Sequence, residues 1–424
     1  MSFGDFVARQ HKAGRLVVQP RMGIGDPIRM RAGLRATKQA NATTVGTITL
    51  DSYTRMGDLA SVAGALRDEI PLNGYPIVSY DPLITRAMLD GMVTEDFPVQ
   101  VRHGSAQPAD IFAALLRVGL HASEGGPVSY CLPYGRTPLN VAVDNWSRAV
   151  DLLLDGAGEL AHLETFGGCM MGQLCPPSLL VALSALEALF FYRKGIRSIS
   201  VSYAQQTNFA QDQDAVLALR RLCTQLIPGA SWHVVIYNYM GVYPRTSGGA
   251  LDLLGKAVEL AVTTGSARII VKTPAEAYRI PNIAENVTAL EHAGAVDRRS
   301  RLAGVVPATG DGEQVYREAR AIVDAVLDLH DDIGRALIVA FRCGLLDVPF
   351  CVHPDNAGRT RSYLAIDGTL GWADIGSLPL SGVAESRRHA SITSASLMSA
   401  LSYVQRTFDT KALTSEATRV VESA

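Results

Sequence analysis

Short apolar runs that favour β-structure alternate with longer segments of helical periodicity along the first 300 residues. Segments of helical pattern lie between the runs, for example Asp58–Asp68, Pro82–Asp90, Ala109–Gly119, Val141–Asp155, Pro177–Lys194, Asp212–Ile227 and Ala250–Thr264. The runs expected to be strands are Arg15–Gln19, Thr47–Asp51, Pro76–Tyr80, Pro98–Arg102, Leu160–Thr165, Ser198–Tyr203, His233–Asn238 and Arg268–Lys272. This alternation favours an α/β fold, a closed (β/α)8 TIM barrel, although an open doubly wound sheet would produce a similar periodicity.

The pattern changes after residue 300. Asp311–Gly334 predicts one long amphipathic helix, and a tail rich in glycine and proline with short strand signals follows it. We therefore expect a barrel over residues 1–300 and a C-terminal appendage, helical and mixed, over residues 301–424. Within the barrel, His103–Asn140 is rich in Gly, Pro, Ser and Tyr and is expected to be a long insertion with a functional role.

Composition narrows the class of protein. The 424 residues are 48% hydrophobic with a formal net charge of -2, and the absence of long like-charge runs argues against nucleic acid or membrane surfaces as partners. The six cysteines show neither a CxxC pair nor a metal-ligating spacing, which is typical of reduced thiols. The first residues lack the apolar core of a signal peptide, and the most apolar stretch, Leu179–Tyr192, is too short to span a bilayer. We expect a cytoplasmic protein without a metal site.

Three arginines, Arg21, Arg55 and Arg102, each lie just past an apolar run that is expected to be a strand. In a parallel α/β fold the carboxyl ends of the strands meet at one edge, where ligands bind. Guanidinium groups bind carboxylate or phosphate through two parallel hydrogen bonds and remain charged at any working pH. The repeated placement predicts a pocket for a small anion with more than one carboxylate.

Two further segments offer polar groups to the same edge. Ser123–Tyr134 places Glu124, Tyr130 and Tyr134 around a Gly-Gly pair; a solvated surface loop is the alternative, but the three arginines favour a loop that binds a substrate ammonium and carboxylates. Lys272 ends the last expected strand, and either an ion pair with the residue four positions later or a cofactor contact would explain it.

Two apparent motifs are rejected. Gly23-Ile24-Gly25 follows a strand, but Ile28 replaces the third glycine of a dinucleotide-binding GxGxxG. Asp328–Gly334 nearly spells the DxHxxG with which B12-binding modules ligate cobalt through histidine, but its glycine comes one position late. A polar helix end with Gly334 as C-cap is the better interpretation.

Many short strings in order give a resemblance that covers nearly the whole chain. They are Gln19-Pro20-Arg21, Asp51-Ser52-Tyr53-Thr54-Arg55, Leu72-Asn73-Gly74-Tyr75-Pro76, Val101-Arg102-His103-Gly104, Glu124-Gly125-Gly126 with Ser129-Tyr130 and Pro133-Tyr134, Pro176-Pro177-Ser178, Lys272-Thr273-Pro274 with Glu276, and Asp347-Val348-Pro349-Phe350. The chain resembles the epsilon, or catalytic, subunit of methylaspartate mutase, also called glutamate mutase, an adenosylcobalamin enzyme.

The resemblance implies roles for individual residues. Arg21, Arg55 and Arg102 would form a claw on the substrate carboxylates, Glu124 would accept the substrate amino group as the catalytic carboxylate, and Tyr130 and Tyr134 would contact substrate. Adenosylcobalamin contacts would be Gly23, Asn73, Pro133, Tyr243, Lys272, Glu276 and Ile280, with Lys272 and Glu276 near the adenosyl group. The family's longer N-terminal helical segment is not found here, which suggests altered dimerisation or partner docking. Tyr237 and the strand end Leu163–Gly167 also differ from the family, with Tyr237 standing where a histidine is expected.

The resemblance also implies a reaction and partners. The family isomerises L-glutamate to (2S,3S)-3-methylaspartate by radical fragmentation and recombination, and neither fragment is held covalently, which explains three arginines. Cobalamin would lie between this chain and a small sigma subunit that carries DxHxxG, in a heterotetramer containing a homodimer of this chain. The alternatives are a mutase on a related amino diacid, a cobalamin-free dicarboxylate lyase or aldolase, and a catalytically silent scaffold.

Overall fold

Eight parallel strands form a nearly closed barrel with helices around it, which confirms the TIM-barrel prediction. The computed structural model describes residues 2–133, 135–169, 174–304, 306–308, 312–386 and 393–423, with side chains to residue 415. The barrel strands are β1 Val17–Gln19, β2 Gly46–Thr49, β3 Val99–Arg102, β4 Ala122–Glu124, β5 His162–Glu164, β6 Ser198–Ala204, β7 Ser231–Tyr237 and β8 Arg268–Ile270. Their order is β1-β8-β7-β6-β5-β4-β3-β2, and a single parallel bridge from Val18 to Thr44 joins the remaining edges.

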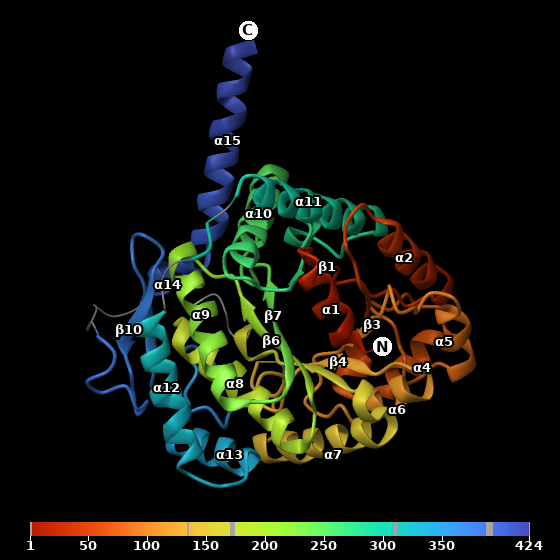
Figure 1. Cartoon of the computed structure of the whole chain (residues 1–424), viewed down its shortest axis with the longest axis horizontal. Coiled ribbons are helices and arrows are strands. Elements are labelled where there is room, and N and C mark those ends of the chain that lie inside the picture. The colour runs from red at the N-terminus through yellow and green to blue at the C-terminus, as the bar shows by residue number, and fades with distance from the viewer. Residues whose placement is uncertain are drawn as a thin grey trace.

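Helices surround this barrel and continue into the C-terminal part (Figure 1). Those up to residue 302 are α1 Phe3–Lys12, α2 Pro27–Gln39, α3 Ser52–Met56, α4 Leu59–Arg67, α5 Pro82–Leu89, α6 Ala109–Arg117, α7 Leu139–Ala157, α8 Pro177–Lys194, α9 Phe209–Leu226, α10 Ser247–Thr263 and α11 Ile283–Leu302. The later elements are α12 Glu313–Leu327, α13 Ile333–Cys343, the hairpin β9 Arg361–Leu364 and β10 Leu370–Asp374, α14 Ser394–Leu401 and α15 Tyr403–Ser423.

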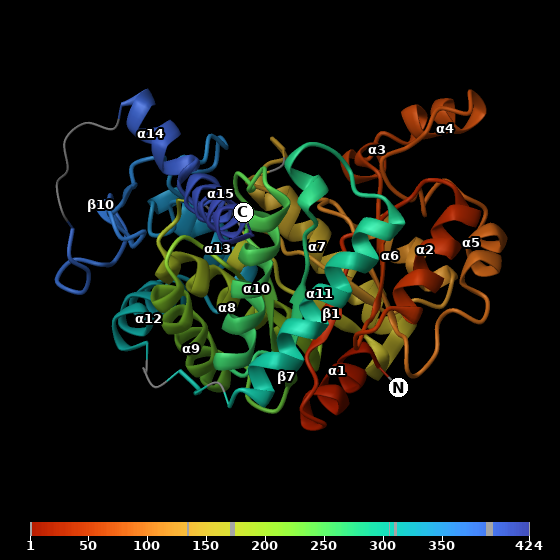
Figure 2. The same ribbon diagram turned by 90° about the horizontal axis from the view of Figure 1, so that it is seen from above.

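The two ends of the barrel differ. Helix α1 closes the amino-terminal end, where the ring centres of Phe3 and His162 lie 5.0 Å apart. A side chain at Gly4 would collide there with the Ser198 hydroxyl. Figure 2 places α1 at one end of the barrel and α3 and α4 at the other. The carboxyl-terminal end of the barrel is therefore the face available for a site.

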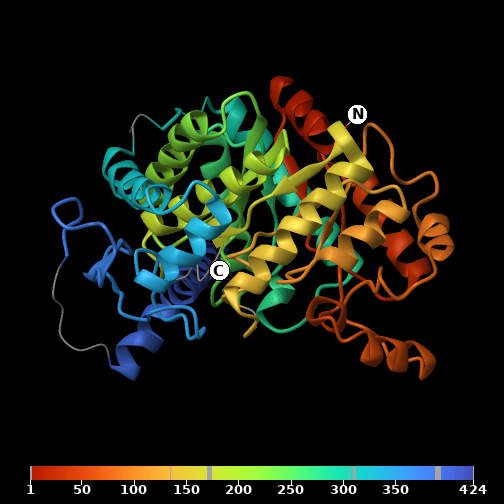
Figure 3. The same ribbon diagram turned by 90° about the horizontal axis from the view of Figure 1, so that it is seen from below.

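Helix α8 is almost completely buried in the wall of the barrel. It packs on β6 and is covered in turn by α9, α12 and α13, so nearly every position is buried, including Glu187. A helix covered on all sides has no need of a polar face, which explains its apolar sequence. The C-terminal elements continue beside α9 and α10, on the side of the barrel opposite α4 (Figure 3). In Figure 1, α15 then projects from the body.

Two sequence predictions are wrong: the strand over Pro76–Tyr80, and the long insertion over His103–Asn140, which in fact contains a barrel strand. Pro76–Tyr80 is a turn, because the backbone N–H groups of Ser79 and Tyr80 both donate to the Pro76 carbonyl and are lost to a strand ladder. The missing strand is β4, which pairs with β3 and β5 inside the expected insertion. Residues 103–140 are therefore mostly barrel, with α6 and β4, and Glu124 lies on a strand and not on a loop.

The prediction of one long helix over Asp311–Gly334 is also wrong. The chain forms α12 and α13, which the turn around His330 separates; Asp311 lies outside the described residues. Asp332 caps α13, and Gly334 lies inside that helix against Val143 and Phe190, so it is not a C-cap. The division of the chain at residue 300 stays a prediction. Among the described residues, no helix has the length and apolarity needed to cross a membrane.

Candidate active site

The three predicted arginines converge on one small cavity at the carboxyl-terminal end of the barrel. It measures about 110 Å³. Its lining comprises Arg21, Thr49, Arg55, Arg102, His103, Gly104, Glu124, Tyr130, Phe166 and Met240. We call it the claw cavity. The structure thus brings together the arginines, the predicted carboxylate and one of the two predicted tyrosines, whereas Tyr134 lies outside the described residues.

Each arginine reaches the claw cavity from a different strand exit. Arg102 is the last residue of β3, and Arg21 lies two residues beyond β1. Arg55 lies on the short helix α3, which the Asp51 side chain caps immediately after β2, and its Nε donates to the His103 carbonyl at 3.0 Å. Because parallel strands end on one face, these positions distant in sequence meet in space.

Arg102 is the buried centre of the claw cavity. Its Nη2 lies 3.2 Å from the Glu124 carboxylate and 3.1 Å from the Tyr237 hydroxyl, and its side chain is 6% exposed. Burial alone would lower the pKa of Arg102, but the Glu124 carboxylate raises it well above the usual value. Its Nη1 is buried and has no hydrogen-bond partner among the described residues, so it is a donor available to a bound anion.

Glu124 receives hydrogen bonds on both carboxylate oxygens. Oε1 accepts from the Tyr130 hydroxyl and from the His103 backbone N–H at 3.2 Å, and Oε2 accepts from Arg102. Gly125 follows with φ +125°, and a side chain there would collide with the Tyr130 ring. Glycine therefore allows the chain to turn back and place Tyr130 on Glu124.

A second buried ion pair lies deeper in the barrel, between Arg268 of β8 and Glu164 of β5, and both side chains are fully buried. The Tyr237 hydroxyl contacts Glu164 and lies 3.4 Å from Glu124, so it links the two pairs. Burial alone would raise the pKa of Glu164, but Arg268 and Arg102 hold it below the usual value. Sequence reasoning missed Glu164 and Arg268, although a charged residue inside a short apolar strand was a usable signal.

A larger cavity opens beside the claw cavity and shares Arg21, Thr49 and Arg55 with it. It measures about 530 Å³, and its lining includes Gly23, Asn73, Glu276 and Ile280, four of the seven residues expected to contact the cofactor. A side chain at Gly23 would collide with the Thr49 carbonyl, so this wall requires glycine. Tyr278 and Ile280 are more than half exposed at its rim.

Lys272 lies over the ring of Tyr243, and its charge is influenced by Glu276, which lines this larger cavity. The Lys272 ammonium lies 4.1 Å from the centre of the Tyr243 ring and donates to the Tyr239 carbonyl at 3.3 Å. Burial lowers the pKa of Lys272 to about 8, partly opposed by the Glu276 carboxylate. The Glu276 carboxylate pairs with Arg21 at 2.6 Å. An arginine of the claw is therefore its ion-pair partner, in place of Lys272, the partner that the sequence suggested. Pro133 lines neither cavity.

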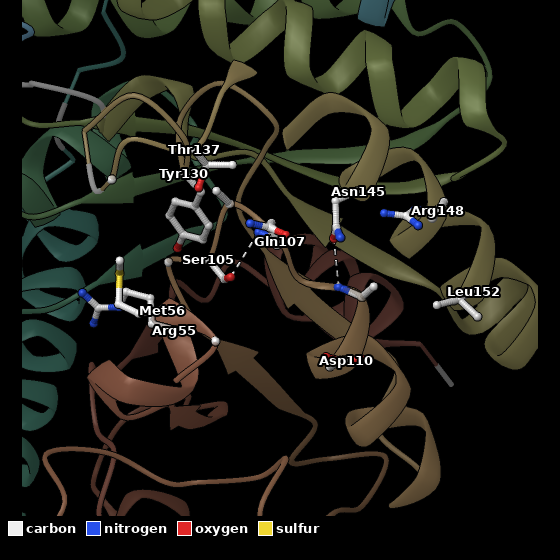
Figure 4. Close-up of a pocket in the computed structure, with 15 residues that line it drawn as sticks. Arg55, Met56, Ser105, Gln107, Asp110, Tyr130, Thr137, Asn145, Arg148 and Leu152 are labelled. Carbon is white, nitrogen blue, oxygen red and sulfur yellow. Dashed lines mark hydrogen bonds between the residues drawn. The ribbon is translucent and has the colours of Figure 1, made fainter. Parts of the chain in front are cut away.

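A third cavity, of about 610 Å³, lies on the other side of the claw between α3, α6 and α7 and shares Arg55, Gly104 and Tyr130 with it. Figure 4 shows Arg55 and Tyr130 on one side of this cavity and Arg148 and Leu152 of α7 on the other. The Asn145 side chain accepts from the Ala109 backbone N–H at 3.2 Å and so fixes the start of α6. The claw cavity therefore has a larger cavity on each of two sides.

Comparison with known proteins identifies the family of this chain. A family model described as methylaspartate mutase E chain matches residues 1–400. The glutamate mutase epsilon subunit of Halobacterium salinarum is 30% identical over 388 residues, covering 88% of this chain and 80% of the relative. That of Yersinia enterocolitica is 28% identical over 384 residues, covering 87% and 79%. That of Escherichia coli O157:H7 is 27% identical over 395 residues, covering 89% and 81%. The chain therefore belongs to the methylaspartate mutase E chain family and is a catalytic subunit of an isomerase.

Proposed function

We propose that this chain is the barrel subunit of an adenosylcobalamin-dependent mutase that interconverts L-glutamate and (2S,3S)-3-methylaspartate. The observation that carries the proposal is the convergence of Arg21, Arg55 and Arg102 with Glu124 in one cavity of about 110 Å³. Pockets for drug-sized ligands run from roughly 300 to 1,000 Å³, so this cavity suits a small metabolite. Three cations around one carboxylate match a ligand with two carboxylates and one ammonium.

The claw residues would bind the substrate and keep water out. One substrate carboxylate would take the vacant Nη1 of Arg102, and the other would bind Arg21 and Arg55 near the mouth. Glu124 would pair with the substrate ammonium while Tyr130 and Arg102 hold the carboxylate of Glu124 in place. Two anchored carboxylates would keep both halves of the substrate in position if the carbon skeleton separates.

We propose that the larger cavity receives part of the cofactor that the family implies. It opens on the face of the claw, its glycine wall permits a close approach, and its rim offers exposed apolar side chains at Tyr278 and Ile280. Gly23, Asn73, Glu276 and Ile280 would hold the cofactor from this side, with Lys272 close by. When bound, adenosylcobalamin would supply the radical chemistry that removes a substrate hydrogen. The chain's own task is to position the substrate and exclude solvent.

We expect the purified chain alone to have no mutase activity. We assign no cobalt-ligating role to His330, whose Nδ1 accepts from the Asp332 backbone N–H at 2.8 Å in a local turn. A small cobalamin-binding sigma subunit with DxHxxG would supply the ligand, in a heterotetramer built on a homodimer of this chain. The assay combines this chain, the candidate partner, adenosylcobalamin and L-glutamate, and follows the absorbance of a coupled mesaconate-forming step.

Omission of each component provides the controls for this assay. Appreciable mutase activity without any partner would contradict the proposal, and so would loss of cobalt ligation in His330→Ala. Breakdown of a dicarboxylate without cobalamin would instead support a lyase on the same barrel.

Glu124→Gln keeps the shape of the side chain and removes its charge. We expect kcat to fall more than KM rises, because the three arginines still anchor both substrate carboxylates while the ammonium loses its ionic partner. Steady-state kinetics with partner and cofactor saturating measure both constants. Glu259→Gln, a surface carboxylate paired with Lys256, is the matched control and should retain both. An unchanged kcat in Glu124→Gln would remove the proposed role, whereas a lost kcat with intact cobalamin binding would support it.

A further inference from the structure

Glu187 of α8 is a buried carboxylate that directs all four of its hydrogen bonds toward the candidate active site. Its Oε1 accepts from the backbone N–H groups of Val128 at 3.2 Å and Ser129 at 2.8 Å. Its Oε2 accepts from the Ser129 hydroxyl at 2.9 Å and from the Phe166 backbone N–H at 3.3 Å. The donors come from the two segments that follow β4 and β5, so one side chain joins two neighbouring strand exits.

A carboxylate at this place is costly for the fold. Glu187 is fully buried in an otherwise apolar helix, and no lysine or arginine of the described residues pairs with it. Burial raises the pKa of Glu187 to about 7, although its four donors lower it. An apolar residue would pack here without desolvating a carboxylate. The role of this carboxylate therefore lies in the two segments whose N–H and O–H donors it binds.

The two segments that Glu187 joins carry walls of the claw cavity. Tyr130 follows Ser129 directly, and its hydroxyl donates to Glu124. Phe166 lines the same cavity, and its ring centre lies 4.9 Å from that of Tyr130. A side chain at Gly126 would collide with the Glu187 carboxylate, so the segment after β4 is packed directly on it.

We propose that Glu187 is a positioning residue whose carboxylate holds the Val128–Tyr130 segment and Phe166, so that the Tyr130 hydroxyl stays on Glu124. The proposal rests on the proposed function only in taking the claw cavity as the active site. In the described part of the chain, the hydrogen bonds of the Glu187 carboxylate all go to these two segments. Its effect on turnover should therefore pass through Tyr130.

Amide hydrogen exchange tests the holding role independently of any activity. Glu187→Gln replaces one acceptor oxygen by an NH2 group that would face N–H donors. We expect faster exchange in the peptides that contain Val128–Tyr130 and Phe166 than in the wild-type chain. Ser129→Ala, which removes only the hydroxyl donor, should show a smaller change at the same peptides.

Asp212→Asn is the matched control, because Asp212 is another buried carboxylate held by backbone and hydroxyl donors, from Gln206 and Tyr203, away from the claw. It should leave exchange at Val128–Tyr130 unchanged. Unchanged exchange at these peptides in both Glu187→Gln and Ser129→Ala would overturn the proposal, whether or not the chain proves to be a mutase.

A double-mutant cycle with Tyr130→Phe in the complete enzyme tests whether Glu187 influences turnover through Tyr130. Glu187→Gln should lower kcat roughly ten- to a hundredfold with a smaller change in KM, because the Tyr130 hydroxyl would no longer be held on the Glu124 carboxylate. In the Tyr130→Phe background most of this loss should disappear. Full additivity of the two losses would overturn the proposal, since a general loss of stability would act in either background. If Glu187→Gln does not fold, the same cycle with Ser129→Ala decides.

Discussion

Arg102→Lys is expected to lower kcat/KM for L-glutamate by roughly thirty- to a thousandfold, about 2–4 kcal/mol of transition-state stabilisation. Lysine keeps the charge but lacks the planar fork that lets one guanidinium hold Glu124 and Tyr237 through Nη2 while Nη1 remains vacant. The group is desolvated, so a lost hydrogen bond is not replaced by water. Steady-state kinetics with partner and cofactor saturating measure the effect.

Lysine variants at Arg21 and Arg55 belong to the same series. Arg21 is one third exposed and already paired with Glu276, so its replacement should cost less than that of Arg102. Arg335→Lys, on the exposed side of α13, is the matched control and should have no effect. Near-normal kcat/KM in all three claw variants would show that the arginines do not bind the substrate. Folding should change little, because the three groups line a cavity.

Arg268→Met is expected to destabilise the fold by about 3–5 kcal/mol, because it leaves the fully buried Glu164 without its cation. Equilibrium unfolding in urea measures the loss at neutral pH. Arg268 holds the pKa of Glu164 below its usual value, so in the wild-type chain this carboxylate contributes stability that is lost as pH falls. In the variant, burial without the cation should raise that pKa. The stability difference between the two chains should therefore narrow as pH falls.

Two further variants separate the buried pair from ordinary charge effects. Lys411→Met breaks the exposed ion pair with Asp252 and should cost at most about 1 kcal/mol. Glu164→Gln combined with Arg268→Met removes both charges and should recover part of the loss. If Arg268→Met were no worse than Lys411→Met, the buried pair would not support the barrel.

The architecture and the meeting of the three arginines could be predicted from the sequence. Seven of the eight barrel strands coincide with predicted apolar runs, and the exits of three of them carry Arg21, Arg55 and Arg102. This works because strand and helix periodicities are local properties, and because parallel strands always deliver their carboxyl ends to one face. Glu124 was also found from sequence, although on the wrong kind of element. Its strand, β4, has three residues, too few to show any periodicity.

Which buried charges pair with one another depends on the tertiary structure. Arg268 and Glu164 are separated by 104 residues, and Glu187 lies 58 residues from Ser129, so no local pattern could pair them. Arg268, Glu164 and Glu187 are charged residues within otherwise apolar segments, and only the closed barrel and its helices bring their partners to them. The same holds for Glu276, which lies four residues from Lys272 in sequence but pairs with Arg21, a residue that follows the neighbouring strand β1. Electrostatic partners depend on distance in space and on the removal of water. Both are set only when the strands close into a barrel and the helices cover it.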